Sequence, residues 1–144
     1  MNRYFITGTD TDCGKTYVTR QLINYYSHAY AIKPIASGCN QVNSHLVSED
    51  AQQLLKADLN LEQINPWRFR LPVSPHIAAE REGASINIHE LVDYCLQFNL
   101  PHMDTLFIEG AGGLMVPLNK QHTWIDFLNL SHIPVLLVVG MKLG

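Results

Sequence analysis

A glycine-containing stretch near the N-terminus has the residues needed to bind phosphate. It reads Gly8-Thr9-Asp10-Thr11-Asp12-Cys13-Gly14-Lys15-Thr16 and follows the apolar run Tyr4-Phe5-Ile6. A loop that joins a strand to a helix directs free backbone N–H groups and the positive end of the helix dipole toward an anion. Lys15 adds positive charge for the β- and γ-phosphates, and the Thr16 hydroxyl can ligate the Mg²⁺ that accompanies them. The stretch predicts a site for nucleotide phosphates.

The spacing of this loop departs from the usual motif. Five residues separate Gly8 from Gly14, one more than in G-x-x-x-x-G-K-[ST], and Thr9 stands where the first glycine normally falls. Because a Gly-Lys-Thr tripeptide alone occurs by chance in many sequences, the prediction depends on its place between an expected strand and an expected helix.

Two further charged residues stand at expected strand ends. Pro34 ends the pairing of the apolar segment 30–35 and leaves Lys33 at its C-terminal end. The strand 105–109 ends in Glu109, and Gly110-Ala111-Gly112-Gly113 follows at once. Open α/β sheets bind ligands at this edge, and an acid there can hold Mg²⁺ directly or through water. Ordinary solvated side chains are the alternative, and for Glu109 the adjoining glycines favour function because they permit close backbone approach.

The elements that must position these residues alternate between strand and helix. Residues 15–29 predict an amphipathic helix whose apolar face consists of Val18, Leu22, Tyr25, Tyr26 and Ala29. Residues 36–47 are expected to form a loop. Ser48 is expected to cap a helix that carries Glu49 and Asp50 in its first turn, where acids also compensate the helix dipole.

Helix starts are also predicted in the second half of the chain. Pro75 is a favoured first helical residue, and Asn87 is expected to cap a helix whose apolar face consists of Ile88, Leu91, Val92, Cys95 and Leu96. Residues 123–130 predict a further short helix. The continuous apolar run 134–140 is typical of a strand buried on both faces of a parallel sheet.

This alternation predicts an α/β fold, a P-loop NTPase-like and mostly parallel sheet with helices on both faces. With 144 residues, 47% of them hydrophobic, the chain is long enough for one domain with a core, so we expect a single domain over residues 1–144. Residues 141–144 follow the last strand where the pattern requires another helix. We therefore expect the domain to be incomplete, truncated at its C-terminus, with apolar surface exposed there.

Composition limits the partners. A formal net charge of −3 gives no basic field for nucleic acid. The three cysteines, Cys13, Cys39 and Cys95, lack the spacing of a disulfide framework or a zinc site and indicate a reducing compartment. No signal peptide is evident, and the longest strongly apolar run, 133–141, is too short to span a bilayer. We expect a cytoplasmic protein without nucleic-acid or membrane partners.

Taken together, the motifs closely resemble those of the dethiobiotin synthetase family along essentially the whole chain. The resemblance rests on these segments: Tyr4-Phe5-Ile6-Thr7-Gly8-Thr9-Asp10-Thr11, Gly14-Lys15-Thr16, Lys33-Pro34-Ile35-Ala36-Ser37-Gly38, Ser74-Pro75-His76, Glu109-Gly110-Ala111-Gly112-Gly113 and Val138-Val139-Gly140-Met141-Lys142-Leu143-Gly144. The phosphate-loop motif of that family has the same extra residue.

The resemblance implies an ATP-dependent enzyme of biotin synthesis with Mg²⁺ as cofactor. Such enzymes take 7,8-diaminononanoate, CO₂ and ATP, and close a cyclic urea through a carbamate and a carbamic-phosphoric anhydride, releasing ADP and phosphate. It further implies a homodimer, and segments beyond Gly144 that grip the adenine.

Residue roles follow from the same resemblance. The catalytic set implied is Lys33, Lys15 and Thr11. The nucleotide set implied is Asp12, Cys13, Gly14, Lys15, Thr16, Tyr17, Glu109, Gly110, Ala111 and Gly112. The diamine or its carbamate is assigned to Ser37, Thr11 and Gly112, and the metal to Thr16, Asp50 and Glu109. Whether Asp50 or the adjacent Glu49 is the ligand stays open at this point.

Two other classes of protein remain as alternatives. Partner-switching P-loop ATPases carry a signature lysine early in the phosphate loop, and Asp10 occupies that position here. An inactive nucleotide-binding fragment is the second alternative, against which the intact Lys15, Thr16, Lys33 and Glu109 argue.

Overall fold

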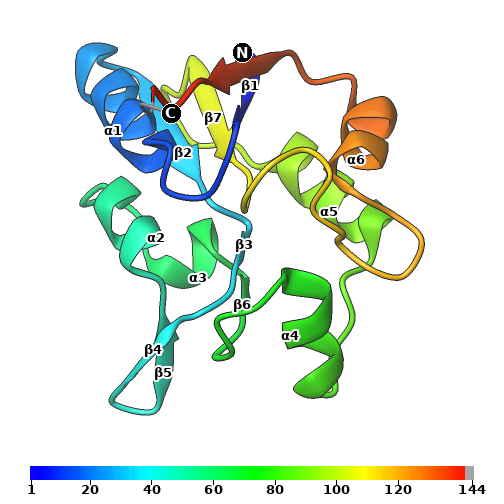
Figure 1. Ribbon diagram of the computed structural model, residues 1–144. Coiled ribbons are helices and arrows are strands. Elements are labelled where there is room, and N and C mark those ends of the chain that lie inside the picture. The colour runs from blue at the N-terminus through cyan, green and yellow to red at the C-terminus, as the bar shows by residue number, and fades with distance from the viewer. Residues whose placement is uncertain (142–144) are drawn as a thin grey trace.

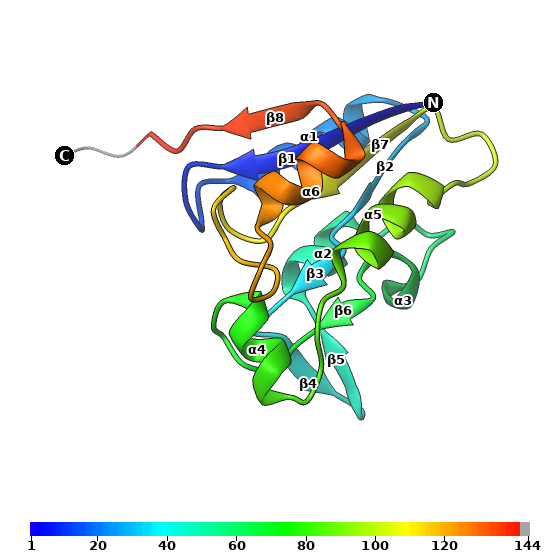
Figure 2. The same ribbon diagram turned by 90° about the vertical axis from the view of Figure 1, so that its right-hand side faces the viewer.

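The centre of the molecule is a four-stranded parallel sheet in the order β2-β7-β1-β8. The computed structural model describes residues 1–141. Its central strands are β1 (Asn2–Gly8), β2 (Ala29–Ile32), β7 (Thr105–Glu109) and β8 (Val135–Val138). Because all four are parallel, their carboxyl ends lie at one edge of the sheet, as Figure 2 shows for β1 and β8.

Helices cover both faces of this sheet. Helix α1 (Lys15–Tyr25) lies on one side, and α5 (Ile88–Gln97) and α6 (Trp124–Ser131) lie on the other (Figure 1). Phe5 of β1 packs against Trp124 and Phe127 of α6, with ring centroids 5.0 and 5.6 Å apart. The Arg3 guanidinium donates to the Cys95 carbonyl of α5 at 3.2 Å. The predicted α/β fold is confirmed.

Smaller elements gather at the opposite end of the molecule from β8 (Figure 2). They are β3 (Ile35–Ala36), β4 (Asn40–Val42), β5 (His45–Val47), α2 (Glu49–Leu54), α3 (Leu61–Ile64), β6 (Trp67–Arg68) and α4 (Pro75–Arg81). Strand β3 pairs with β6 in parallel, and β4 pairs with β5 as an antiparallel hairpin. Within residues 1–141, no helix has the length and apolar character needed to cross a membrane.

The predicted helix starts are confirmed. Ser48 accepts a hydrogen bond from the Ala51 N–H at the start of α2, and Pro75 is the first residue of α4. Asn87 caps α5, and Thr123 caps α6. These caps supply acceptors for N–H groups that have no partner inside the helix.

The predicted extent of the first helix is wrong, and its predicted apolar face is right only for Val18 and Leu22, which are half-buried, since Tyr25 and Tyr26 are exposed. Helix α1 ends at Tyr25, and Ala29 already belongs to β2. The buried residues of α1 are Lys15, Thr19 and Ile23, whereas Tyr25 is 81% exposed. Lys15, the first helical residue, turns into the interior, and this sets the phase of the helix about its axis. Leu96 of α5, expected on the buried face, is likewise exposed.

The segment predicted as a loop over residues 36–47 contains regular structure. It holds the end of β3 and the β4–β5 hairpin, whose turn is formed by Asn43 and Ser44 with φ of 46° and 70°. Two successive residues with positive φ are typical of the turn that suits the twist of a hairpin. All three residues of β4 are exposed, so hydrophobic alternation gave no signal for this strand.

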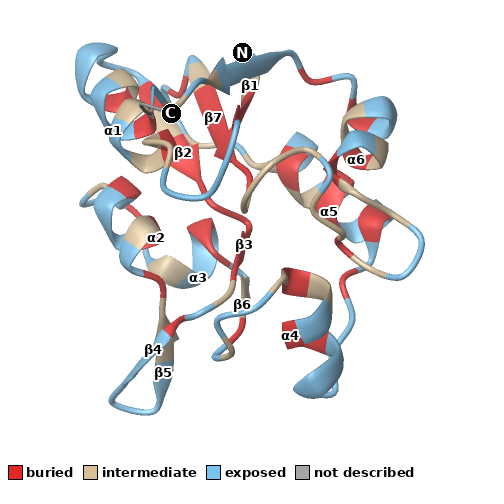
Figure 3. Ribbon diagram, viewed as in Figure 1, coloured by how far each residue is buried: buried red, intermediate tan, exposed pale blue. Residues whose placement is uncertain are grey.

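The strand expected to be buried on both faces lies at the edge of the described sheet. Strand β7 is buried, whereas Val135, Leu136 and Leu137 of β8 are 42%, 37% and 57% exposed (Figure 3). A strand buried on both faces requires covering elements on each side. Residues 1–141 do not supply that cover, which agrees with the expected exposure of apolar surface at this end.

Backbone contacts join the end of β8 to the phosphate loop. The Thr9 N–H donates to the Val138 carbonyl at 3.1 Å, and the Gly140 N–H donates to Thr9 Oγ1 at 3.1 Å. The residue that stands in place of the usual glycine therefore ties the loop to the last described strand.

Candidate functional site

The phosphate loop runs from the end of β1 into α1. Gly14 caps α1 with a φ of 99°, a left-handed conformation that glycine adopts without strain. Among the described residues no side chain caps this helix, so its N-terminus remains available to an anion. Gly8 lies against the loop so closely that an added Cβ would stand 2.1 Å from Cys13 Sγ.

Lys15 folds back over this loop. Its ammonium donates to the Asp10 carbonyl at 3.0 Å, and the residue is only 7% exposed. The positive charge of Lys15 thus lies close to the N-terminus of α1. Phosphates of a nucleotide bound there would be attracted both by the ammonium and by the N-terminus of the helix.

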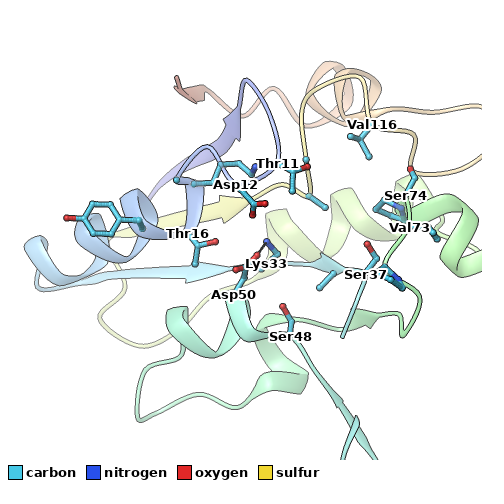
Figure 4. Close-up of a pocket in the computed structure, with 18 residues that line it drawn as sticks. Thr11, Asp12, Thr16, Lys33, Ser37, Ser48, Asp50, Val73, Ser74 and Val116 are labelled. Atoms are coloured by element: carbon cyan, nitrogen blue, oxygen red, sulfur yellow. Dashed lines mark hydrogen bonds and ion pairs between the residues drawn. The ribbon is translucent and has the colours of Figure 1, made fainter. Parts of the chain in front are cut away.

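The ends of β2 and β7 bring Lys33 and Glu109 together. Ile32 pairs with Ile108 in the parallel register, so the residues that follow them are neighbours at the carboxyl edge. Lys33 Nζ lies 2.7 Å from Glu109 Oε1 and 2.8 Å from Asp50 Oδ2. The Thr16 hydroxyl donates to the same Glu109 Oε1 at 2.7 Å. Figure 4 shows Lys33, Asp50 and Thr16 pointing toward one another.

The charges in this cluster change one another's proton affinity. Burial alone would lower the pKa of the Lys33 ammonium, but the charges of Glu109 and Asp50 outweigh it and raise that pKa. Burial alone would raise the pKa of Asp50, but the Lys33 ammonium, with hydrogen bonds from Lys33 and Thr16, lowers it. Lys33 therefore stays positive and Asp50 negative across the neutral range.

The same cluster contains oxygen atoms suited to Mg²⁺. Glu109 is fully buried, and its Oε2 has no hydrogen-bond partner among the described residues. Hydroxyl and carboxylate oxygens of Thr16, Asp50 and Glu109 are the hard ligands that Mg²⁺ prefers, and phosphates and water complete its shell. In residues 1–141 no three His, Cys, Asp or Glu side chains lie together in a group that could hold a metal ion.

The structure distinguishes Asp50 from its neighbour. Asp50 contacts Lys33, whereas Glu49 Oε1 accepts a hydrogen bond from Asn40 Nδ2 at 2.9 Å, outside the Lys33 cluster. Of the two acids, Asp50 is therefore the one placed to meet a metal beside Glu109.

A cavity of about 740 Å³ brings most of the sequence-predicted residues together. Those that line it are Thr11, Asp12, Gly14, Lys15, Thr16, Tyr17, Lys33, Ser37, Asp50, Ala111 and Gly112 (Figure 4). Three predicted residues do not line it. Cys13 lies against Gly8, Gly110 packs closely on the Phe5 ring, and Glu109 is buried behind Lys33.

Several lining residues were missed by the sequence analysis. Pro72, Val73 and Val116 form an apolar part of the wall, and Ser48 lines the cavity in addition to capping α2. Val116 lies so close to Gly112 that an added Cβ there would meet its Cγ2 at 2.7 Å. Isolated apolar residues in loops have no periodicity, so the sequence pattern did not indicate that these residues line the cavity. The position of Val73 next to the Ser74-Pro75 motif was the available signal for its place in the wall.

Comparison with known proteins agrees with this geometry. A family model described as an AAA domain matches residues 2–144. The chain is 65% identical over 147 residues to the ATP-dependent dethiobiotin synthetase BioD of Legionella pneumophila (strain Paris), with 100% of this chain and 68% of that protein covered. It is 38% identical to the proteins of the same name from Pseudoalteromonas translucida, 66% covered, and Aeromonas salmonicida, 67% covered.

The chain thus spans about two thirds of the length of these relatives. The match includes the described elements that line the cavity, from the phosphate loop to Gly112 and Val116. On this similarity, and with the fold and the P-loop in place, the chain belongs to the ATP-dependent dethiobiotin synthetase family.

Proposed function

We propose that this protein makes dethiobiotin from 7,8-diaminononanoate, CO₂ and ATP, with release of ADP and phosphate. Family membership makes it an ATP-dependent ligase of biotin synthesis. The observation that carries the finer proposal is the position of Lys33. Its ammonium lies in the wall of a cavity shared by the phosphate loop and by Ser37 (Figure 4).

The chemistry needs positive charge at this place. One amine nitrogen forms a bond to CO₂ and loses a proton, which gives a carbamate anion. A carbamate oxygen then attacks the γ-phosphorus as the bond to ADP breaks. The second amine attacks the carbonyl carbon, loses a proton and expels phosphate, which closes the ring. Because the carbamate and the γ-phosphoryl group are both anionic where they meet, a fixed cation lowers the barrier.

The residues of the cavity divide between these partners. Lys15 and the N-terminus of α1 bind the ATP phosphates, and Lys33 neutralises the carbamate and the transferred phosphoryl group. The hydroxyls of Thr11 and Ser37 and the backbone at Gly112 orient the diamine. The apolar wall formed by Pro72, Val73 and Val116 offers contact for its hydrocarbon chain.

Magnesium fits the same site. Thr16, Asp50 and Glu109 would hold it, and when bound it neutralises phosphate charge. Lys33 forms ion pairs with Asp50 and Glu109, two of these three residues. The Lys33 ammonium and the metal would therefore contact the same carboxylates.

A coupled assay for ADP tests the proposal. We expect ADP and phosphate to form only when the diamine and bicarbonate are both present with MgATP. Brisk ATP hydrolysis without the diamine would overturn the proposal and favour a partner-switching ATPase. Nucleotide binding without turnover under any condition would favour an inactive nucleotide-binding protein.

Lys33→Met gives a sharper test of the site. Removal of one charge aimed at the transition state should lower kcat by about a hundredfold or more, and the dissociation constant for ATP should change by less than about threefold. Lys120→Met is the matched control, because Lys120 is exposed and paired with Glu80 away from the cavity. Equal losses of turnover and nucleotide affinity in Lys33→Met would contradict the role assigned to Lys33.

A further inference from the structure

A buried asparagine outside the cavity contacts the backbone of Lys33. Asn65 follows α3, is 0% exposed and is absent from the residues that line the cavity. Its Nδ2 donates to the Lys33 carbonyl at 2.6 Å and also reaches the Pro34 carbonyl at 3.4 Å. The side chain thus meets the segment that carries the central cation of the site without touching that cation.

The donor character of this side chain is what the contact uses. Both groups that face Nδ2 are carbonyl oxygens, so the reverse orientation of the amide would place Oδ1 against two acceptors. Asn65 Oδ1, in contrast, has no hydrogen-bond partner among the described residues. The carboxamide therefore works here as a donor alone.

The Lys33-Pro34 segment depends on few other contacts. Strand β2 ends at Ile32 and β3 begins at Ile35, so the two residues between them belong to neither strand. Pro34 has no N–H to donate. The Lys33 N–H donates to the Ile64 carbonyl at 2.9 Å, and the Pro34 carbonyl accepts from the Trp67 N–H at 3.0 Å. The Lys33 carbonyl, within the described residues, accepts its hydrogen bond from Asn65.

We propose that Asn65 is a positioning residue for the reaction: its carboxamide fixes the Lys33-Pro34 peptide and thereby where the Lys33 ammonium lies. This inference rests on the proposed function of Lys33. A group misplaced by about 1 Å can lower the rate by about a hundredfold. A donor that fixes the backbone on the C-terminal side of Lys33 is therefore worth a measurable factor in turnover, although it contacts no substrate.

Two substitutions remove the donor in different ways. Asn65→Leu keeps the branch at Cγ but is larger and has no polar group, and Asn65→Asp keeps the shape but an ionised carboxylate cannot donate. We expect either change to lower kcat by about ten- to a hundredfold and to leave KM for ATP nearly unchanged. Asn60→Ala is the matched control, because it removes the cap of the same helix α3 without a contact to Lys33.

A double-mutant cycle separates positioning from general destabilisation. If Asn65 acts through Lys33, Asn65→Leu should have little further effect on kcat once Lys33→Met is present. Independent, multiplicative losses would overturn the proposal, as would an Asn65→Leu enzyme whose kcat matches that of Asn60→Ala. If both Asn65 variants fail to fold, Asn65 has a purely structural role and the proposal is wrong.

A crystal structure of Asn65→Leu tests the inference without turnover. We expect the Lys33 carbonyl to rotate and the ammonium to leave Glu109, and an unchanged Lys33 would overturn the proposal. A wild-type protein that makes no ADP with the diamine would instead refute the proposed function. The two failures are therefore distinguishable.

Discussion

The Lys33 ammonium and the proposed Mg²⁺ would bind to the same carboxylates. The ammonium contacts Asp50 Oδ2 and Glu109 Oε1, and Thr16 donates to the latter oxygen. These are the atoms proposed to hold Mg²⁺. Lysine and metal should therefore compete for the carboxylates, and a bound metal would favour the transfer of the ammonium toward the anionic substrates.

Substitution of Lys33 should accordingly raise metal affinity. Two unit charges about 4 Å apart interact by roughly 4 kcal/mol at an effective dielectric constant near 20, so Lys33→Met should bind Mg²⁺ about tenfold or more tightly in the nucleotide-free protein. Calorimetric titration with MgCl₂ measures this, with Lys120→Met as the control. Weaker binding to Lys33→Met would show that Lys33 helps to build the metal site.

The cysteines should differ in reactivity. Cys13 is half-buried in the phosphate loop, whereas Cys39 and Cys95 are buried and burial raises the pKa of both thiols. Because the thiolate is the reactive form, iodoacetamide at about pH 8 should modify Cys13 first, and ATP should slow that reaction. Peptide mass spectrometry resolves the three sites. Modification of Cys95 as fast as Cys13 would contradict the expectation.

Among the elements, the phosphate loop depends on the absence of a side chain at Gly8. A Cβ there would lie 2.1 Å from Cys13 Sγ and 3.1 Å from Lys15 Cγ. Overpacking of this kind costs about 1–3 kcal/mol, so Gly8→Ala should weaken ATP binding by about ten- to a hundredfold.

A second substitution tests the cause. Cys13→Gly removes the closest atom and should restore part of the affinity in the Gly8→Ala background, with Cys13→Gly alone as the control. Titration with a fluorescent ATP analogue measures both effects. A double variant no better than Gly8→Ala would place the damage elsewhere in the loop.

The elements that sequence could predict are those with a strong local signal. Strand β7, the caps Ser48 and Asn87 and the proline that starts α4 each follow from one local rule, and all are confirmed. The β4–β5 hairpin lacked such a signal because its strands are short and mostly exposed. Its turn depends on Asn43 and Ser44 adopting positive φ, which pairing with the opposite strand decides.

The site divides in the same way. Lys33 and Glu109 could be placed together from sequence because strand ends of a parallel sheet share one edge. Asn65 could not, because it reaches Lys33 through a contact between segments distant in sequence. Val73 and Val116 could not, because they are isolated apolar residues in loops and have no periodicity. Family resemblance supplied Asp50 and Ser37, and the structure places both in the cavity wall.

For the molecule as a whole, two titratable groups buried around α5 should make the folded state less stable at alkaline pH. Burial raises the pKa of the Cys95 thiol above its ordinary 9.0 and that of the Tyr94 hydroxyl above its ordinary 10.0. Unfolding lets both groups release protons near those ordinary values, whereas the folded protein keeps them protonated. Their contribution is complete below pH 9.0 and is lost as the pH rises toward the folded-state values.

Urea unfolding measured between neutral and alkaline pH checks this prediction. The free energy of unfolding should fall by up to about 1.4 kcal/mol per pH unit for each group above its ordinary pKa. Cys95→Ala removes one titrating group and should make the decline shallower. A stability that does not change above pH 9.0 would contradict the assignment.

The quaternary state and the cellular location are also properties of the whole molecule. The homodimer and the cytoplasmic location stay predictions. Sedimentation equilibrium of the protein with and without MgATP measures the first. Strand β8 has exposed apolar residues at the edge of the described sheet. If the protein self-associates through β8, Leu137→Lys should abolish the association, and the same sedimentation measurement of this variant tests this.

The bonds between Thr9 and the end of β8 have a mechanical consequence. The loop that receives the phosphates and the last described strand share the Thr9 N–H and hydroxyl, so neither can loosen without the other. ATP should then slow hydrogen–deuterium exchange at Gly140, far along the chain from the loop. Conversely, tension applied to that strand should hasten the departure of the nucleotide. Thr9→Val loses the hydroxyl bond to Gly140 but keeps the N–H bond to Val138, so it should weaken both responses.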